Sequence, residues 1–323
     1  MPATLRRILA GAFALALLAA PAQAQDYPNR VIRIVVGFGA GGGNDIFARL
    51  VGAKLSELIG QSVIIENKPG AGARLGNEYA ANQPADGYTL LVAASGGMSI
   101  ASAIYPKLAY HPTKSFVPLT MIANFPLILV VPADHPAKDV KELAAWMKSN
   151  PDKANYATSS PAFTIATELF KLKTGAPGQP IPYKSSNESL LSIIGGQTLL
   201  TIADGPPTVP QVKGGKVKAL AVTGSVRSAE LPNVPTMAEA GLPEVNTKLW
   251  SGLFVQAATP APIVKKLEET LRKAIADPDV NAKLKAMAVD PGGGPSAEFR
   301  AMIDADIKTT AEVVKAANLK FEE

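Results

Sequence analysis

The sequence predicts an α/β fold that is divided into two domains. Short runs of β-branched residues alternate with longer segments whose apolar residues recur at helical spacing, which is the pattern of strands separated by helices. The chain has 323 residues, and one hydrophobic core rarely serves so many. A glycine-rich turn follows the first strand-like run, at the position where α/β proteins commonly bind ligands.

The first 24 residues have the pattern of a cleaved secretory signal peptide. Two arginines precede an apolar run at 8–20, which is too short for a typical membrane-spanning helix. The small residues Ala22 and Ala24 then form a signal-peptidase motif, so we expect cleavage after Ala24 and a mature chain that begins at Gln25. We expect this mature protein to work outside the cytoplasm and not to be membrane-embedded.

Composition narrows the chemistry that the chain can perform. It contains no cysteine, which excludes disulfides, thiolate metal sites and a cysteine nucleophile. The formal net charge is only +5 and the lysines are scattered, so we expect no nucleic-acid partner. The two histidines, His111 and His135, each precede a proline in a loop-like segment, and no G-x-S-x-G motif is present. We interpret both as surface turn residues, and we predict no enzyme activity, no catalytic residue, no metal and no cofactor.

Strands and helices are expected in alternation along the chain. The strand-like runs are 31–36, 62–66, 89–93, 127–131 and 218–222. The periodic helical segments are 46–59, 140–148, 164–173 and 262–276. Crossovers of this length predict largely parallel sheets. Because there is no internal repeat and no low-complexity linker, we expect two domains that exchange strands.

Residues 31–45, VIRIVVGFGAGGGND, carry the strongest functional signal. The strand-like run ends in a segment with five glycines, and an amphipathic helix is expected to begin near Asn44. Glycines let the backbone approach a ligand closely, and the unpaired N–H groups of a helix start attract an anion. Loops with small or polar residues also follow other expected strands, at 67–76, 94–99, 158–164 and 204–208. Where such loops from two sheets face each other, they would enclose a small molecule.

The same glycine-rich loop also matches a dinucleotide-binding pattern. Gly37, Gly39 and Gly42 follow G-x-G-x-x-G, and Glu66 ends the next strand, where an acid that binds ribose is expected. However, a secreted protein meets little nicotinamide cofactor, and Asp45 in the first helical turn would repel a pyrophosphate. A secreted nucleotide-dependent enzyme is therefore retained only as an alternative.

Motifs spread along the chain match those of one known family. They are GFGAGGGND (37–45), ENKPGAGA (66–73), ADGYTLL (85–91), YHPTKSFVPL (110–119), IPYKSS (181–186), GGQ (195–197), GGKVKALAVT (214–223), LPNVPTMAEAGLP (231–243) and WSGLF (250–254). From Tyr27 onward the chain resembles the Bug, or TctC-type, periplasmic solute receptors of tripartite tricarboxylate transporters. The resemblance implies a type II periplasmic-binding-protein fold, in which two α/β domains joined by two crossing segments close on a small carboxylate. We place domain 1 at 26–124 plus 227–323, and domain 2 at 125–226.

The resemblance also implies which residues line the ligand cleft. The glycine-rich loop would form the first wall with Phe38, Ala40, Gly41 and Gly42. Behind this wall, Asn44 or Asp45 would cap the helix. A second loop of domain 1 would supply Ser95, Gly96 and Gly97. Domain 2 would supply the opposing wall with Thr158, Ser159, Ser160, Thr164 and Asp204. A carboxylate held by backbone N–H groups and ordered water needs no arginine.

In domain 2 the chain departs from the family pattern at two places. Family members commonly carry a glycine- and asparagine-containing loop where this chain has S-P-A-F-T at 160–164. The proline of this segment has no backbone N–H to donate, and Phe163 adds an apolar surface beside the ligand. A common family acid appears here as Ala203, with Asp204 next to it. This change weakens the case for an amino-acid ligand unless Asp204 turns inward, and capping of the segment 206–211 is an equally good interpretation of Asp204.

One further departure concerns Arg74, where the family more often has a small or amide residue. In the cleft its guanidinium would pair with a second carboxylate of the ligand, but a solvent-facing position is favoured from the sequence. Other family matches are interpreted as architectural, with Trp250 packing between the domains or against a C-terminal helix; they are Tyr88, Tyr183, Lys184 and Trp250.

Together, these expectations predict a monomeric receptor that binds a small carboxylate by closing its cleft. The ligand would be a dicarboxylate, a tricarboxylate or an aromatic carboxylate without an amine. Its protein partners would be the integral membrane subunits of a tripartite tricarboxylate-type transporter. A solute sensor for a membrane kinase is the second alternative, because a sensor and a transport receptor would share one binding fold.

Overall fold

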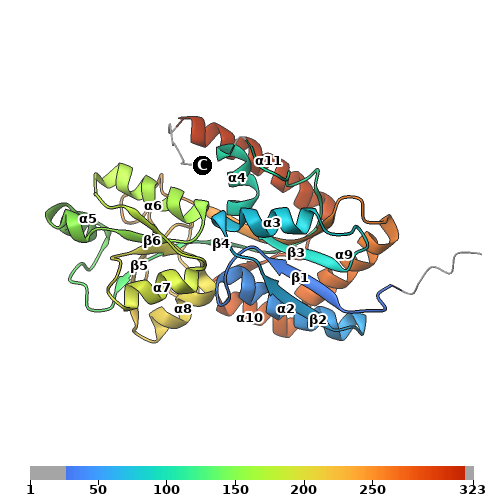
Figure 1. Cartoon of the computed structure of the whole chain (residues 1–323). Coiled ribbons are helices and arrows are strands. Elements are labelled where there is room, and N and C mark those ends of the chain that lie inside the picture. The colour runs from blue at the N-terminus through green and yellow to red at the C-terminus, as the bar shows by residue number, and fades with distance from the viewer. Residues whose placement is uncertain (1–26, 106, 317–323) are drawn as a thin grey trace, which may run out of the picture.

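The computed structural model describes residues 27–105 and 107–316, and it has two α/β domains, each built on its own sheet (Figure 1). The predicted signal peptide at 1–24 and its cleavage site lie outside the described residues. In the described residues, no helix combines the length and the apolar character that crossing a membrane requires.

Domain 1 contains a six-stranded sheet in the spatial order β11-β4-β10-β3-β1-β2. Its strands are β1 (Ile32–Val36), β2 (Val63–Asn67), β3 (Thr89–Ala94), β4 (Phe116–Pro126), β10 (Lys248–Gln256) and β11 (Asp290–Pro291). β1 pairs in parallel with β2 and β3, whereas β10 pairs antiparallel with β3 and β4. The expectation of largely parallel sheets is therefore wrong, because β10 returns from domain 2 and enters this sheet in the opposite direction.

The faces of this sheet are covered by two sets of helices. One face packs against α2 (Gly43–Ile59), α9 (Ala261–Ala276) and α10 (Pro278–Ala286), and the other against α3 (Arg74–Ala81), α4 (Ser99–Ile104) and α11 (Ser296–Ala316). Side chains of a strand alternate between faces, so Ile34 and Val36 of β1 join the core under α2, whereas Val35 joins the core under α3 and α11.

Trp250 anchors α11 to this sheet. Its ring meets that of Phe299 edge-on, with the ring centroids 5.2 Å apart, and its indole N–H donates to Asp306 at 2.9 Å. Packing against the C-terminal helix was one of the two positions predicted for Trp250, and the structure confirms it.

Domain 2 has a smaller sheet and also carries helices on both faces. Its strands are β5 (Ile128–Pro132), β6 (Tyr156–Thr158), β7 (Pro180–Pro182), β8 (Thr201–Ala203) and β9 (Val217–Val222). β5 lies antiparallel between β8 and β9, β6 pairs with β7, and a bridge from Tyr156 to Leu200 sets β6 beside β8. One face is covered by α5 (Val140–Ser149) and α6 (Pro161–Thr174), the other by α7 (Ser186–Ile194) and α8 (Gly205–Lys213). Single 3₁₀ turns occur at Ala71–Ala73, Ser95–Gly97 and Pro151–Lys153.

Two segments cross between the domains, and Thr223 fastens one to the other. The first crossing runs from β4 into β5 through Leu127, and the second leads from β9 to β10 through 223–247. The backbone N–H of Thr223 donates to the carbonyl of Leu127 at 2.9 Å, and its hydroxyl accepts from the Leu127 N–H at 2.8 Å. The same hydroxyl donates to the carbonyl of Thr247 at 2.5 Å. The exact domain boundaries at 124/125 and 226/227 stay a prediction.

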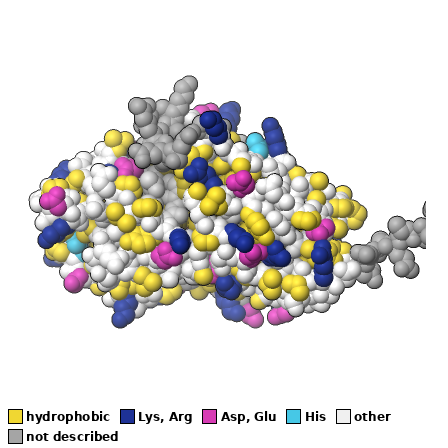
Figure 2. Space-filling model, viewed as in Figure 1, with side chains coloured by type: hydrophobic (Ala, Val, Ile, Leu, Met, Phe, Trp, Pro, Cys, Tyr) yellow, Lys and Arg dark blue, Asp and Glu magenta, His cyan; other side chains and the backbone are white. Residues whose placement is uncertain are grey.

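The surface and the histidines complete this description. On the face drawn in Figure 2, basic and acidic side chains are interspersed. The interpretation of His135 as a surface residue is wrong, because it is buried and its ring packs against Trp146 with centroids 4.8 Å apart. This burial lowers the pKa of His135.

Candidate functional site

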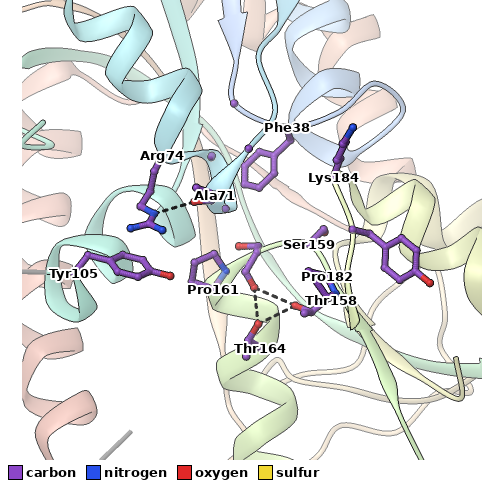
Figure 3. Close-up of a pocket in the computed structure, with 16 residues that line it drawn as sticks. Phe38, Ala71, Arg74, Tyr105, Thr158, Ser159, Pro161, Thr164, Pro182 and Lys184 are labelled. Carbon is purple, nitrogen blue, oxygen red and sulfur yellow. Dashed lines mark hydrogen bonds between the residues drawn. The ribbon is translucent and has the colours of Figure 1, made fainter. Parts of the chain in front are cut away.

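Two adjoining cavities lie between the domains and together form one cleft. The large cavity has a volume of about 460 Å³ and is lined by Gly37, Phe38, Gly70–Arg74 and Tyr105 from domain 1, and by Thr158–Pro161, Thr164 and Pro182–Lys184 from domain 2 (Figure 3). The small cavity has a volume of about 20 Å³, which is room for roughly one water molecule. Phe38, Ser159 and Ser160 line both cavities.

The walls of the cleft are loops that follow the carboxyl ends of strands. In domain 1 they follow β1, β2 and β3, and in domain 2 they follow β6, β7 and β8. This is the edge at which open α/β sheets bind ligands. The structure thus brings together the strand-following loops that the sequence singled out.

Four helices begin at the small cavity. Gly43 starts α2, Ser160 is the N-cap of α6, Ser186 starts α7 and Asp204 is the N-cap of α8, and all four residues line the cavity. A helix N-terminus presents unpaired N–H groups and a partial positive charge. Because four such ends converge on one small space, the electrostatic field there favours a negatively charged group of a ligand.

Hydrogen bonds hold the glycine-rich loop from both domains. The Gly39 N–H donates to the carbonyl of Lys184 in domain 2 at 2.8 Å, and the side-chain amide of Asn67 donates to the carbonyl of Phe38 at 3.0 Å. The carboxylate of Asp45 accepts from the Gly41 N–H at 3.0 Å. The loop is therefore fixed in the shape that exposes Phe38 and the start of α2 to the cleft.

Asp45 and Asn44 do not cap α2, so that expectation is wrong. The N-cap position is occupied by Gly42, and no capping hydrogen bond from a side chain forms there within the described residues. Asp45 instead forms an ion pair with Arg49 at 2.9 Å. Burial opposes ionisation of Asp45, but its hydrogen bonds, first of all that from Arg49, lower its pKa below the ordinary value. The side chain of Asn44 lines the small cavity and accepts a hydrogen bond from the Ser251 hydroxyl at 2.6 Å.

Asp204 occupies the N-cap position of α8, as one of its two interpretations expected, but its side chain turns inward and does not cap the helix. Its side chain makes no capping bond to α8, is only 3% exposed and lines the small cavity. Oδ2 lies against Gly43 of the other domain. It is so close that the Cβ of any other residue at position 43 would overlap it. Oδ1 is buried and has no hydrogen-bond partner among the described residues. Burial raises the pKa of Asp204 to about 6, although hydrogen bonds from Ser186 and Gly43 oppose this shift.

Arg74 faces the large cavity, whereas the sequence favoured a solvent-facing position. Its guanidinium carbon lies 3.7 Å from the centroid of the Tyr105 ring, and its Nε donates to the carbonyl of Ala71 at 3.1 Å. Within the described residues Arg74 forms no ion pair. Figure 3 shows Arg74 and Lys184 on opposite sides of the cavity, which has no carboxylate among its described lining residues. The large cavity is therefore suited to a second negative group.

The other predicted site residues divide into two groups. Those that line a cavity are Phe38, Gly42, Asn44, Gly96, Thr158, Ser159, Ser160, Phe163 and Thr164. Those that line neither cavity are Ala40, Gly41, Asp45, Ser95, Gly97 and Ala203. Ala40 is exposed and Ala203 is fully buried, while the Ser95 hydroxyl accepts weakly from the Trp250 N–H at 3.5 Å.

Several residues that line the cleft were not named as site residues from the sequence. The turn at 70–73 lies in a loop that follows a strand, and Tyr183 and Lys184 lie in the IPYKSS motif, so both had a signal in the sequence. Tyr105 had none, because it reaches the cleft only through the packing of α4.

Glu66, the acid on which the dinucleotide interpretation depends, lines neither cavity. It pairs with Arg33 at 3.2 Å and with Lys68 at 2.8 Å, so the dinucleotide interpretation loses its ribose-binding acid.

The fold and the cleft define a two-domain solute-binding protein. Residues 47–319 match the family described as "Tripartite tricarboxylate transporter family receptor", and the chain belongs to this family of periplasmic binding proteins. Protein BugT of Bordetella pertussis is 32% identical over 311 residues, which are 95% of this chain and 95% of BugT.

Two solved structures from Rhodopseudomonas palustris are similar to this chain and were determined with carboxylates. One is a protein with adipate, with a TM-score of 0.86 and 33% identity over 91% of this chain and 99% of that chain. The other is MatC with bound malate, with a TM-score of 0.85 and 31% identity over 89% of this chain and 100% of that chain.

Proposed function

We propose that this protein is a periplasmic receptor that binds a small carboxylate in the interdomain cleft and delivers it to a tripartite tricarboxylate-type transporter. The observation that carries the proposal is the convergence of four helix N-termini on the small cavity. Family membership and the adipate and malate bound to two similar proteins support it. The mature chain, which begins after Ala24, acts as a monomer.

In this proposal the ligand spans both cavities. One carboxylate lies where the two cavities adjoin, and backbone N–H groups of α2 and α6 hold it together with an ordered water in the small cavity. The rest of the ligand extends into the large cavity between Phe38 and Thr164, and a second carboxylate meets the guanidinium of Arg74. The ligand class is thus a dicarboxylate or a larger polycarboxylate.

Binding works through closure of the two domains, divided at 124/125 and 226/227, about the crossing segments. Both walls of the cleft contact the ligand only when the domains meet, so the ligand stabilises the closed form that the membrane subunits recognise. Glycines of domain 1 permit this close approach, because a Cβ at Gly72 would lie 2.7 Å from Cδ of Pro161, and one at Gly96 would overlap the Ser160 hydroxyl. No bond of the ligand is broken in this cycle.

Thermal unfolding of the mature chain against a panel of carboxylates and nicotinamide nucleotides tests the proposal. A carboxylate at 100 times its Kd stabilises the protein by about 2.7 kcal/mol, which is readily measured. Native mass spectra recorded in parallel identify a co-purified carboxylate and report the oligomeric state. Stabilisation by nucleotides alone would instead support the secreted nucleotide-dependent enzyme.

A further inference from the structure

Within the described residues, Asp204 is the only ionisable side chain that lines the small cavity. The elements packed around it contribute neutral groups: Gly43 and Asn44 from α2, Ser159 and Ser160 from the start of α6, Ser186 from α7, and Phe125 and Leu249 from the crossing strands. The nearest acid on α2, Asp45, is engaged with Arg49 and faces away from the cavity. On the other side, Gly205 abuts the carbonyl of Met287. No charged neighbour is therefore present to keep the Asp204 carboxylate ionised.

This placement conflicts with the binding of an anion. An ionised Asp204 and a ligand carboxylate would share one buried space, and like charges at such a separation cannot both stay ionised without a large cost. The helix ends that converge there compensate one negative charge better than two. One proton placed between the two carboxyl groups removes the repulsion and supplies a hydrogen bond.

The two oxygens of Asp204 already differ in their surroundings. Oδ2 lies against Gly43 at the start of α2, where it acts as an acceptor. Oδ1 is buried and finds no partner in the part of the chain that the structure describes, and a buried acceptor without a hydrogen bond is unfavourable. A proton on Oδ1 would turn this atom into a donor directed at the cavity.

We infer that carboxylate binding is coupled to the uptake of one proton by Asp204, whose Oδ1 then donates to the ligand carboxylate or to the water beside it. The inference rests on the proposed function. The proton comes from the solvent before the cleft closes. The raised pKa of Asp204, about 6 because of burial, means that this proton is available near neutral pH.

A different ligand would use Asp204 in the opposite way. An amino acid would place its ammonium group against an ionised Asp204 and would need no proton. The convergent helix ends disfavour a cation at the small cavity, so the structure favours the protonated form. The two possibilities make opposite predictions for the neutral variant Asp204→Asn, which keeps the shape of the side chain.

Isothermal titration calorimetry of the mature protein tests this inference with adipate, malate, citrate, benzoate, aspartate and glutamate. Titrations run from pH 5 to pH 8, in two buffers with different ionisation enthalpies. We expect the wild type to take up close to one proton per bound carboxylate at pH 7. Its Kd should rise roughly tenfold per pH unit above pH ~6. Asp204→Asn should bind with a Kd that is independent of pH and equal to that of the wild type at pH 5.

The control variant is Asp152→Asn, because Asp152 is an exposed acid of domain 2 that lines neither cavity. It should keep the pH dependence of the wild type. A wild-type Kd that is constant from pH 5 to pH 8 without proton uptake would overturn the inference and leave the receptor function intact. Binding of aspartate or glutamate that is lost in a folded Asp204→Asn variant would overturn it as well and would identify an ammonium ligand. Absence of binding by every carboxylate at every pH would reject the proposed function itself.

Discussion

Gly43 and Asp204 meet across the cleft, although they belong to different domains. Oδ2 of Asp204 occupies the place where any side chain at Gly43 would begin. Gly43 is the first residue of α2 and Asp204 is the N-cap of α8, so the contact joins two of the four helix starts at the small cavity. The proposed anion site is thereby linked to closure of the domains.

Gly43→Ala should prevent full closure. The added Cβ would overlap the carboxylate of Asp204, so this buried side chain has to leave its position or the domains have to separate. We expect the Kd for carboxylates to rise at least tenfold while the free energy of unfolding changes little, because alanine is well tolerated at a helix start. Gly294→Ala is the control, since its Cβ would meet only the flexible Glu298 carboxylate at 3.2 Å. Wild-type affinity in Gly43→Ala would refute the closed geometry of the binding state.

Arg74→Ala should weaken the binding of dicarboxylates selectively. The guanidinium is held over Tyr105 and is free to form a charge-assisted pair, which typically contributes about 1.5–3 kcal/mol. The Kd for adipate should therefore rise by roughly 10- to 150-fold. Hexanoate, which has the same chain length and a single carboxylate, should bind wild type and variant alike. An equal loss for both ligands would show that Arg74 supports the cleft without contacting a second carboxylate.

Thr223→Val should destabilise the fold at the crossing segments. The Thr223 side chain is 1% exposed. Because valine has no hydroxyl, the Leu127 N–H and the Thr247 carbonyl would lose the hydrogen bonds that they form with the Thr223 hydroxyl. Buried unpaired groups of this kind cost about 1–3 kcal/mol. Urea unfolding should show this decrease, whereas Thr270→Val, at an exposed hydroxyl that bonds only within α9, should stay within about 0.5 kcal/mol of wild type. If the two variants are equally stable, the hydrogen bonds of the Thr223 hydroxyl do not stabilise the two crossing segments.

The stability of the ligand-free protein should depend on Asp204 in a defined pH range. The folded protein raises the pKa of this group from 3.8 to about 6, so its protonated form adds stability that is complete below pH ~4 and is lost as the pH rises through 6. Asp204→Asn lacks this titration. The variant should match the wild type at pH 4 and exceed it at pH 8 by on the order of 1–3 kcal/mol in urea unfolding. Parallel stability curves for the two proteins would contradict the burial of Asp204.

The sequence anticipated the elements well where a local pattern determines them. Strand β1 and helix α9 lie within one residue of their expected bounds, because period and turn residues mark their ends. Helix α2 begins at Gly43, one residue before the start expected near Asn44 and three residues before the periodic segment, since glycine carries no helical signal. The direction of β10 could not be predicted, because it depends on the return of the chain from domain 2.

The same distinction holds for the site. Strand-following loops predicted most of the cleft, whereas the inward orientation of Arg74 depends on its stacking against Tyr105, a tertiary contact without a sequence signal. The position of Asp204 likewise depends on how closely Gly43 of the other domain approaches. Side chains whose direction is set by a neighbour far along the chain were the ones that the sequence could not place.

A crystal structure of the mature protein with a carboxylate that stabilises it tests most directly whether the ligand binds in the interdomain cleft. We predict closed domains, with the carboxylate oxygens about 3 Å from backbone donors at the starts of α2 and α6 and the ligand extending toward Arg74. A ligand bound outside the cleft, or a nucleotide bound along the glycine-rich loop, would contradict it.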